Sequence, residues 1–106
     1  MKLTIVIDNQ SRDLELPDTL LEDGESFFQK MDNDMNQGWQ MGPDYVESPN
    51  QLQRCQIAAD KILTAIDTEN NNLLYLMAGY IVSRVPNVKS IDINTSGELN
   101  DTQINT

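Results

Sequence analysis

Histidine is absent from this chain of 106 residues, and cysteine occurs once, as Cys55. Without histidine, the chain has no Ser–His or Cys–His nucleophile pair and no imidazole general base. Zinc sites that need histidine are also excluded, because one cysteine builds neither a thiolate site nor an internal disulfide. An unpaired cysteine is typical of a reducing compartment, and on the apolar face of a helix it acts as a small, inert hydrophobic residue.

Long hydrophobic runs are missing as well. No segment reaches the roughly 18–20 apolar residues that span a bilayer. The first ten residues, MKLTIVIDNQ, hold one lysine and a short apolar run that soon turns acidic, without the h-region and small-residue cleavage site of a signal peptide. We therefore expect a cytoplasmic protein with no membrane partner.

Basic residues are few, at 7 against 17 acidic residues, which gives a net charge of −10 at pH 7. Residues 1–47 hold 11 acidic and 3 basic residues, so −8 of this charge lies in the N-terminal half. Such a surface repels nucleic acid and anionic lipid, and we expect no nucleic-acid partner. It suits a basic protein patch or a divalent cation, although the charge also serves solubility alone.

Alternating apolar residues predict the strands of a small sheet. An inner strand is expected over 2–8 and a second over 12–16, joined as a hairpin by the turn residues 9–11 and ended by Pro17. Residues 88–93 predict a last strand in the same sheet. Residues 99–106 are polar and aperiodic, so we predict one compact domain over 1–98 followed by a flexible polar tail.

Helical spacing of apolar residues predicts three helices between these strands. The first runs from about residue 23 to Gly38, with an apolar face made of Phe27, Phe28, Met31 and Met35. The second begins at Ser48-Pro49, an N-cap serine followed by proline at the first helical position, and ends near Asp67.

The third predicted helix, residues 73–85, is apolar on nearly every side and is expected at the centre of the core. Gly79 in its middle permits a close helix contact, and Pro86 ends it. The element order ββαααβ predicts an α+β fold. Its sheet is small, with two to three strands formed by the N-terminal hairpin and the C-terminal strand, and three helices cover it.

The segment 39–47 lacks a clear period but carries four large apolar side chains. Gly42-Pro43 marks a turn, and the apolar residues are Trp39, Met41, Tyr45 and Val46. Tryptophan and tyrosine are favoured anchors at protein interfaces. We therefore hypothesise a non-enzymatic protein-interaction module that contacts a protein partner, or a second copy in a homodimer, through these four residues. The alternative is that they are buried within the protein itself.

The stretch MDNDMNQGWQMG, residues 31–42, raises the question of a metal site. Asp32, Asp34 and Asn36 stand at the alternate positions of the first three side chains in a calcium loop. Gln37 stands where that loop needs glycine, and Pro43 where it needs a closing glutamate. A divalent-cation-binding domain that uses these three residues is our alternative function, and no other cofactor is expected.

Asp32 and Asp34 also fall in the last turn of the first predicted helix, where negative charge opposes the helix dipole. A compensating cation would be Lys30, Arg54 from the next helix, or a metal ion. The alternative to a metal site is therefore a solvated helix end, paired with Arg54. An enzyme that uses Arg54 with acids among Asp44, Glu47 and Asp60 is a third hypothesis.

The stretch DINTSGELNDTQ, residues 92–103, resembles the EF-hand calcium loop, with Gly97 at its sixth position. Gln103 replaces the closing glutamate, and the pattern predicts no flanking helices. We therefore expect a strand end, a glycine turn and a flexible tail here.

Two stretches, DMNQGWQMG and RCQIAADKIL, resemble segments of small uncharacterised bacterial proteins. The resemblance covers residues 31–66 and implies a bacterial, cytosolic origin. It implies no activity, so no functional residue is carried over from it.

Overall fold

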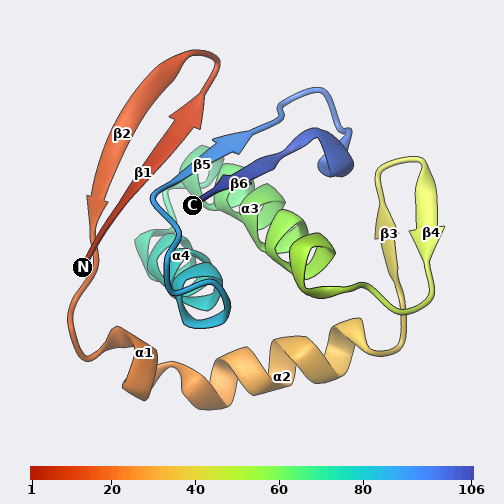
Figure 1. The fold of residues 1–106 in the computed structure, drawn as a ribbon, viewed down its shortest axis with the longest axis horizontal. Helices are drawn as coiled ribbons and strands as arrows, with labels where there is room; N and C mark the ends of the chain where they lie inside the picture. Colours follow the sequence, from red (N-terminus) through yellow and green to blue (C-terminus); the bar gives the residue numbers. More distant parts are fainter.

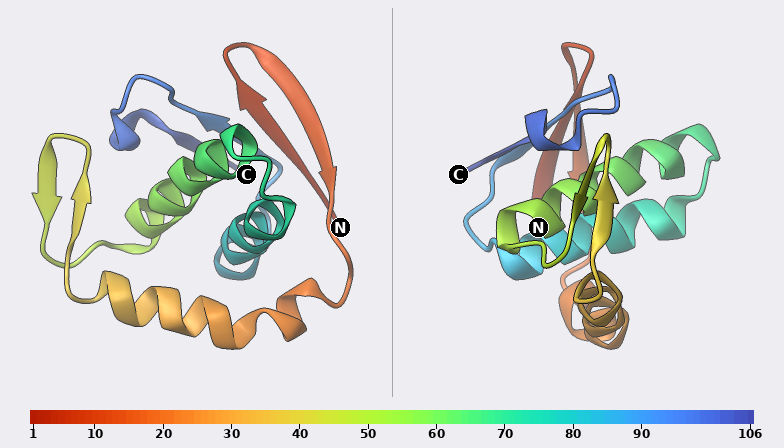
Figure 2. Two further views of the ribbon diagram at one scale, coloured as in Figure 1. Left: turned by 180° about the vertical axis from the view of Figure 1, so that it is seen from behind. Right: turned by 90° about the vertical axis from the view of Figure 1, so that its right-hand side faces the viewer.

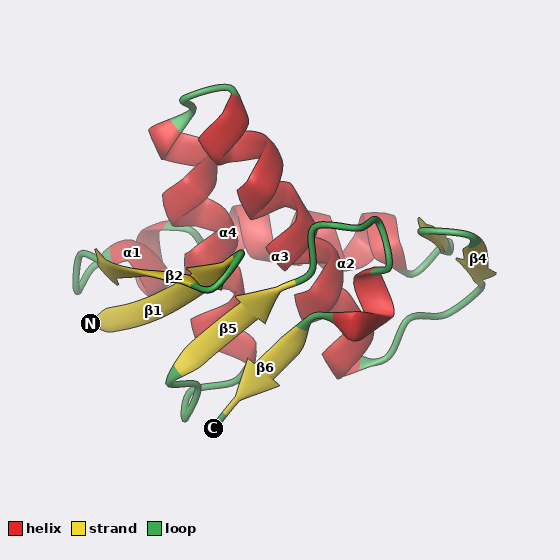
Figure 3. Cartoon of the chain, turned by 90° about the horizontal axis from the view of Figure 1, so that it is seen from above, coloured by secondary structure: helices red, strands yellow, loops and turns green.

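The computed structural model describes all residues, Met1–Thr106, as a mixed sheet with helices on one face (Figures 1 and 3). The elements are β1 (Lys2–Ile7), β2 (Gln10–Glu15), α1 (Leu20–Asp23), α2 (Glu25–Met35), β3 (Trp39–Met41), β4 (Asp44–Val46), α3 (Gln51–Asp67), α4 (Asn71–Arg84), β5 (Ser90–Ile93), a 3-10 helix η1 (Leu99–Asp101) and β6 (Gln103–Asn105). The α+β class is confirmed. The sheet is larger than predicted, because it has four strands in the order β2-β1-β5-β6, and β3-β4 forms a second, two-stranded sheet.

Strand β1 is an inner strand, as its apolar alternation predicted. It pairs antiparallel with β2 and parallel with β5, so that Ile5 lies between Arg12 and Ile91. The hairpin turn is Asp8-Asn9, with φ of 52° and 67°, and β2 therefore starts two residues earlier than predicted. Type I′ turns need positive φ at both central residues, which aspartate and asparagine tolerate better than most residues.

The prediction of a flexible tail over 99–106 is wrong. Residues 103–105 form β6, which pairs antiparallel with β5, and Leu99 and Thr102 are buried. The Gln56 amide of α3 donates hydrogen bonds to the carbonyls of Asn100, at 3.1 Å, and Thr102, at 3.0 Å. Leu99 and Ile104 also contact the core, but much of the segment is held by hydrogen bonds, which leave little trace in the hydrophobic pattern.

The helices differ from the predictions at two places. The first predicted helix is α2, which begins at Glu25, close to the predicted start, and the short helix α1 precedes it where no helix was predicted. Helix α3 is capped by Asn50 and starts at Gln51, instead of at Ser48-Pro49. Asn50 and Gln53 form a capping box in which each side chain accepts from the other residue's backbone N–H, at 2.8 and 2.9 Å.

Helices α3 and α4 form a layer between the sheet and α2. In the right-hand view of Figure 2, α2 is seen end-on while α3 and α4 lie across the page, so α2 crosses them steeply. Gly79 permits this contact, as predicted. A Cβ at that position would lie 2.9 Å from Leu20 Cδ2 and 3.1 Å from Phe28 Cζ.

We predict that Gln56→Ala lowers the free energy of unfolding by about 2 kcal/mol, because two carbonyls lose their donor. Amide hydrogen exchange over 99–105 should accelerate more than exchange elsewhere. The matched control is Gln29→Ala, at an exposed position of α2, which should change stability by less than about 0.5 kcal/mol. Equal effects of the two changes in urea unfolding would contradict this role for Gln56.

Candidate functional site

Three helix ends meet at the carboxylate of Asp32, which lies in the last turn of α2. Its Oδ1 accepts hydrogen bonds from Tyr80 Oη, at 2.5 Å, and Arg54 Nη1, at 3.1 Å. Its Oδ2 accepts from Nη2 and Nε of Arg84, at 2.7 and 3.2 Å. We name these four residues the Asp32 clamp. The charge that offsets the C-terminal end of α2 is therefore a pair of arginines, one of which is the predicted Arg54.

Further contacts hold both arginines of the clamp. Asn36 Oδ1 accepts from Arg54 Nη2 at 2.5 Å, and a Glu25 oxygen lies 3.4 Å from Arg84 Nη1. The Arg84 guanidinium stacks 5.1 Å from the ring centre of Tyr80 and 5.9 Å from that of Phe28. Both arginine side chains are only 16 % exposed, so water screens these charges weakly.

Protonation behaviour follows from this geometry. Burial acts to raise the pKa of Asp32, but the hydrogen bonds from Tyr80, Arg84 and Arg54 outweigh it and leave this pKa below its usual value. Burial, and then the bond to Asp32, raise the pKa of Tyr80. Burial also raises the pKa of Cys55 to about 11, so its thiol stays protonated at neutral pH.

The structure does not bring the three residues of the hypothetical metal site around one point. Asp32 and Asn36 both bind the guanidinium of Arg54, whereas Asp34 is exposed and lines a hollow with Lys30 and Lys61. No group of three or more cysteine, aspartate or glutamate side chains lies close enough together to hold a metal ion. In the segment that resembles a calcium loop, Asn94 Oδ1 accepts from the backbone N–H and the hydroxyl of Ser96.

The four residues of the hypothetical contact surface do not share one face. Residues 39–46, expected as an aperiodic loop, form the β3–β4 hairpin at one end of the molecule (Figure 1). Trp39 pairs with Val46 and Gln40 with Tyr45, so Tyr45 points to the opposite side from Trp39. Met41 is fully buried, Trp39 and Val46 are half-buried, and Tyr45 is 60 % exposed. The exposed aromatic surface of this hairpin therefore belongs to Trp39 on one face and to Tyr45 on the opposite face.

Trp39 instead belongs to a groove centred on Lys61 of α3. Lys61 Nζ lies 4.9 Å from the centre of the Trp39 ring. Three adjoining hollows of about 290, 170 and 40 Å³ all have Lys61 in their lining. We name this surface the Lys61 groove, and its residues are Phe27, Lys30, Met31, Asp34, Met35, Trp39, Ile57, Asp60, Lys61, Thr64, Leu73 and Met77.

The groove has an apolar floor and a charged rim. Met31 and Met77 are buried in the floor, and Phe27 is 38 % exposed at its edge. Two lysines and two aspartates, Lys30, Lys61, Asp34 and Asp60, stand around it. Burial raises the pKa of Asp60, although neighbouring Lys61 partly offsets this. The arrangement fits apolar side chains of a binding partner, with charges of both signs at the margin.

Sequence reasoning missed Lys61, and it placed Phe27 on the buried face of its helix. Adjacent residues of a helix point about 100° apart, so Phe27 lies at one edge of the apolar stripe of α2 and Phe28 at the other. Phe28 is fully buried. Of the acids proposed for an enzyme, Asp60 lies in the groove, while Asp44 and Glu47 are exposed at or beside β4 and Arg54 is held in the clamp.

Comparison of the chain with models of known protein families, with curated proteins and with solved structures finds no match. None of its helices combines the length and the apolar character that crossing a bilayer requires.

We predict that substituting Asp32 and Asp34, two residues apart, changes the free energy of unfolding to very different extents. Asp32→Asn should lower the free energy of unfolding by roughly 2–3 kcal/mol, because it removes the one anion of Arg54 and the closer of the two anions of Arg84. Asp34→Asn should change it by less than about 0.5 kcal/mol, or raise it slightly, because an unpaired charge leaves the helix C-terminus. Urea unfolding of both variants at pH 7 measures this, and similar losses would refute the clamp as the main anchor of α2.

The clamp also predicts a pH dependence. Because folding lowers the pKa of Asp32, its stabilising contribution is complete above the usual value of 3.8 and is lost as the pH falls through the lowered pKa. Unfolding free energies measured from pH 6 downwards should therefore fall more steeply near and below that value for the wild type than for Asp32→Asn. Parallel curves for the two proteins would contradict this assignment.

Proposed function

We propose that this chain is a non-enzymatic protein-interaction module whose contact surface is the Lys61 groove. The observation that carries the proposal is that a half-buried Trp39 and a partly exposed Phe27 each line a hollow with Lys61, over buried methionines. Tryptophan and methionine are enriched where proteins bind one another.

The shape of the groove supports a protein partner. Its space is spread over three open hollows of about 290, 170 and 40 Å³, whereas a small-molecule site gathers roughly 300–1,000 Å³ in one cleft. Side chains that protrude from another protein fill a row of shallow hollows, and lysines at the rim attract acidic groups beside them. The free cysteine supports a cytoplasmic setting, and the resemblance of residues 31–66 supports a bacterial one.

A photoreactive residue tests this proposal directly. We predict that p-benzoylphenylalanine at position 27 forms a protein adduct on irradiation in the cells that make this protein, whereas the same residue at Gln29 does not. Both positions are exposed on α2, but only Phe27 lines the groove. An adduct of twice the chain's mass identifies a second copy, and any other mass identifies a different partner.

A charge reversal provides the second control. Lys61→Glu should reduce the adduct at position 27 about tenfold, as the loss of a contact at the centre of an interface does. Lys89→Glu makes the same charge change at an exposed position far from the groove in the chain and should leave the adduct unchanged. Equal adducts at positions 27 and 29, or none at 27, would overturn the proposal.

A further inference from the structure

Strand β2 presents an unpaired edge. It is the outermost strand on its side of the four-stranded sheet. Leu16 N donates to Met1 O at 2.6 Å, so even-numbered positions of β2 are the hydrogen-bonded partners of β1. Bonding in antiparallel pairs alternates along the strand, so the N–H and C=O groups of Ser11, Asp13 and Glu15 point away from the sheet. Such a row of free groups is a template for another strand.

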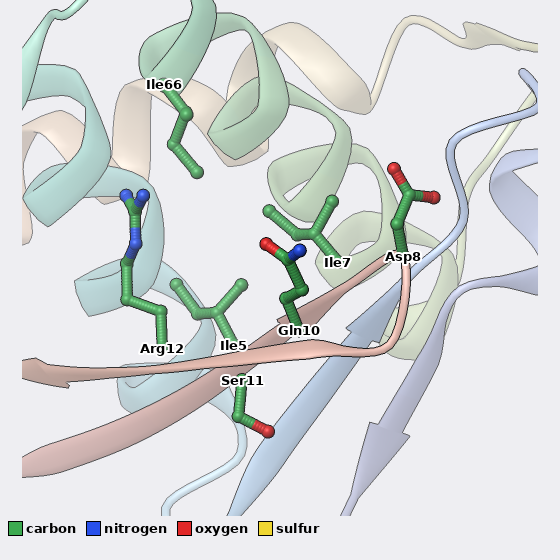
Figure 4. Close-up of a pocket in the computed structure, with 7 residues that line it drawn as sticks. All are labelled: Ile5, Ile7, Asp8, Gln10, Ser11, Arg12 and Ile66. Carbon is green, nitrogen blue, oxygen red and sulfur yellow. The ribbon is translucent and has the colours of Figure 1, made fainter.

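A hollow lies on the helix side of the same strand. One part, of about 460 Å³, lies between the hairpin and Ile66. A second part, of about 490 Å³, also has Arg12 and Ile66 in its lining and reaches Ala65 and Leu74. Figure 4 shows Gln10 and Arg12 standing toward the helices, whereas Ser11 points to the other face. The helix layer therefore offers the apolar side chains of Ala65, Ile66 and Leu74 beside the free edge, with Glu69 and Asn71 next to them.

We propose that the β2 edge binds an extended segment of a partner protein in which basic and aliphatic residues alternate. In an added strand, one set of side chains would lie over Ile66 and Leu74, which favours aliphatic residues there. The other set would lie beside Asp13 and Glu15 on the outer face, where cross-strand lysine or arginine gives opposite-charge pairs. The side chains of Asp13 and Glu15 are 56 % and 78 % exposed.

Charge around the edge favours the same partner. Lys2 Nζ lies 3.3 Å from Asp13, and the N-terminal ammonium lies 3.6 Å from Glu15 and 3.4 Å from Asp18, but these carboxylates are largely exposed and water screens such pairs. The chain as a whole carries a net charge of −10, so a basic segment is attracted to it from a distance. Main-chain hydrogen bonds then supply affinity and the alternate side chains supply selectivity, as in other strand-addition complexes.

A second copy of this chain is a poorer occupant. Antiparallel pairing of two β2 strands centred on Asp13 uses every free group of the edge but sets Asp13 opposite Asp13. Pairing centred on Arg12 sets Arg12 opposite Arg12. Like charges directly opposite one another destabilise a strand pair. The edge is thus better matched to a different, basic chain, and it shares no lining residue with the Lys61 groove.

A labelled peptide, Lys-Val-Lys-Val-Lys-Val-Lys with capped ends, tests the proposal by fluorescence anisotropy on the intact protein. We expect saturable binding and new hydrogen-exchange protection of the Ser11, Asp13 and Glu15 amides. Methylation of the alternate peptide nitrogens that would pair with β2 should weaken binding about tenfold. The same residues in block order, Lys-Lys-Lys-Lys-Val-Val-Val, should weaken it similarly. Equal binding of all three peptides, or none at millimolar concentration, would overturn the proposal.

Substitution at Ser11 gives a test from the protein side. Ser11→Pro removes an outward N–H without removing a bond to β1, and proline is tolerated at such an edge position. We expect it to weaken peptide binding about tenfold, while Ser11→Ala leaves binding within about twofold. Equal binding by a folded Ser11→Pro variant would contradict the edge. Lys61→Glu should not affect this peptide, so failure here and failure of the Lys61 groove are distinguishable.

Discussion

The carboxylate of Asp32 is the contact on which the arrangement of the helices depends. It joins the last turn of α2 to the first turn of α3 and the last turn of α4, through two arginines and one tyrosine. Asp32 stands at the end of α2 where its charge is unfavourable, and Arg54 stands at the end of α3 where a positive charge is unfavourable. Each residue offsets the other, so two local conflicts with the helix dipole become one stable junction.

This junction also explains how α2 is held across a layer that it meets steeply. Beneath the ion pairs, Phe28 packs edge-on against Tyr80, with ring centres 6.0 Å apart. Gly79 lets the α1–α2 layer approach α4 closely enough for that contact. The Lys61 groove lies along the same helix, where Phe27, Met31 and Asp34 leave a row of hollows against α3 and α4. The way in which α2 is anchored therefore shapes the proposed contact surface.

Much of the fold could be predicted from the spacing of hydrophobic residues along the sequence. The elements that were predicted wrongly share a physical cause. The inner strand, the hairpin, the apolar central helix and the strand after Pro86 each have a face that must be buried, which the sequence pattern records. Strand β6, η1 and the start of α3 depend on polar contacts from Gln56 and from the Asn50–Gln53 box. Such contacts join residues without apolar periodicity, although the Asn50–Gln53 spacing itself was a readable cap signal.

The candidate site was less predictable than the fold. The unfavourable charge of Asp32 at a helix C-terminus could be predicted from the sequence, and Arg54 was among its expected partners. Tyr80 and Arg84 could not be predicted as partners, because they lie 48 and 52 residues further along the chain. Periodicity places residues on faces of their own element and does not show which faces meet. For the same reason, the sequence showed Trp39 as a candidate anchor without showing that Lys61 lies over its ring.

The parallel pairing of β1 with β5 has a consequence for how the chain reaches this structure. Ile5 is paired with Ile91, so the centre of the sheet forms only between segments from opposite ends of the chain. Pairings this distant in sequence are slow to form, because a long loop must close before they stabilise anything. During synthesis, the β1–β2 hairpin therefore leaves the ribosome long before its partner strand, with the apolar face of β1 uncovered. Transiently exposed apolar surface and unpaired strand edges of this kind favour aggregation, so early burial of β1 by the helices limits that risk.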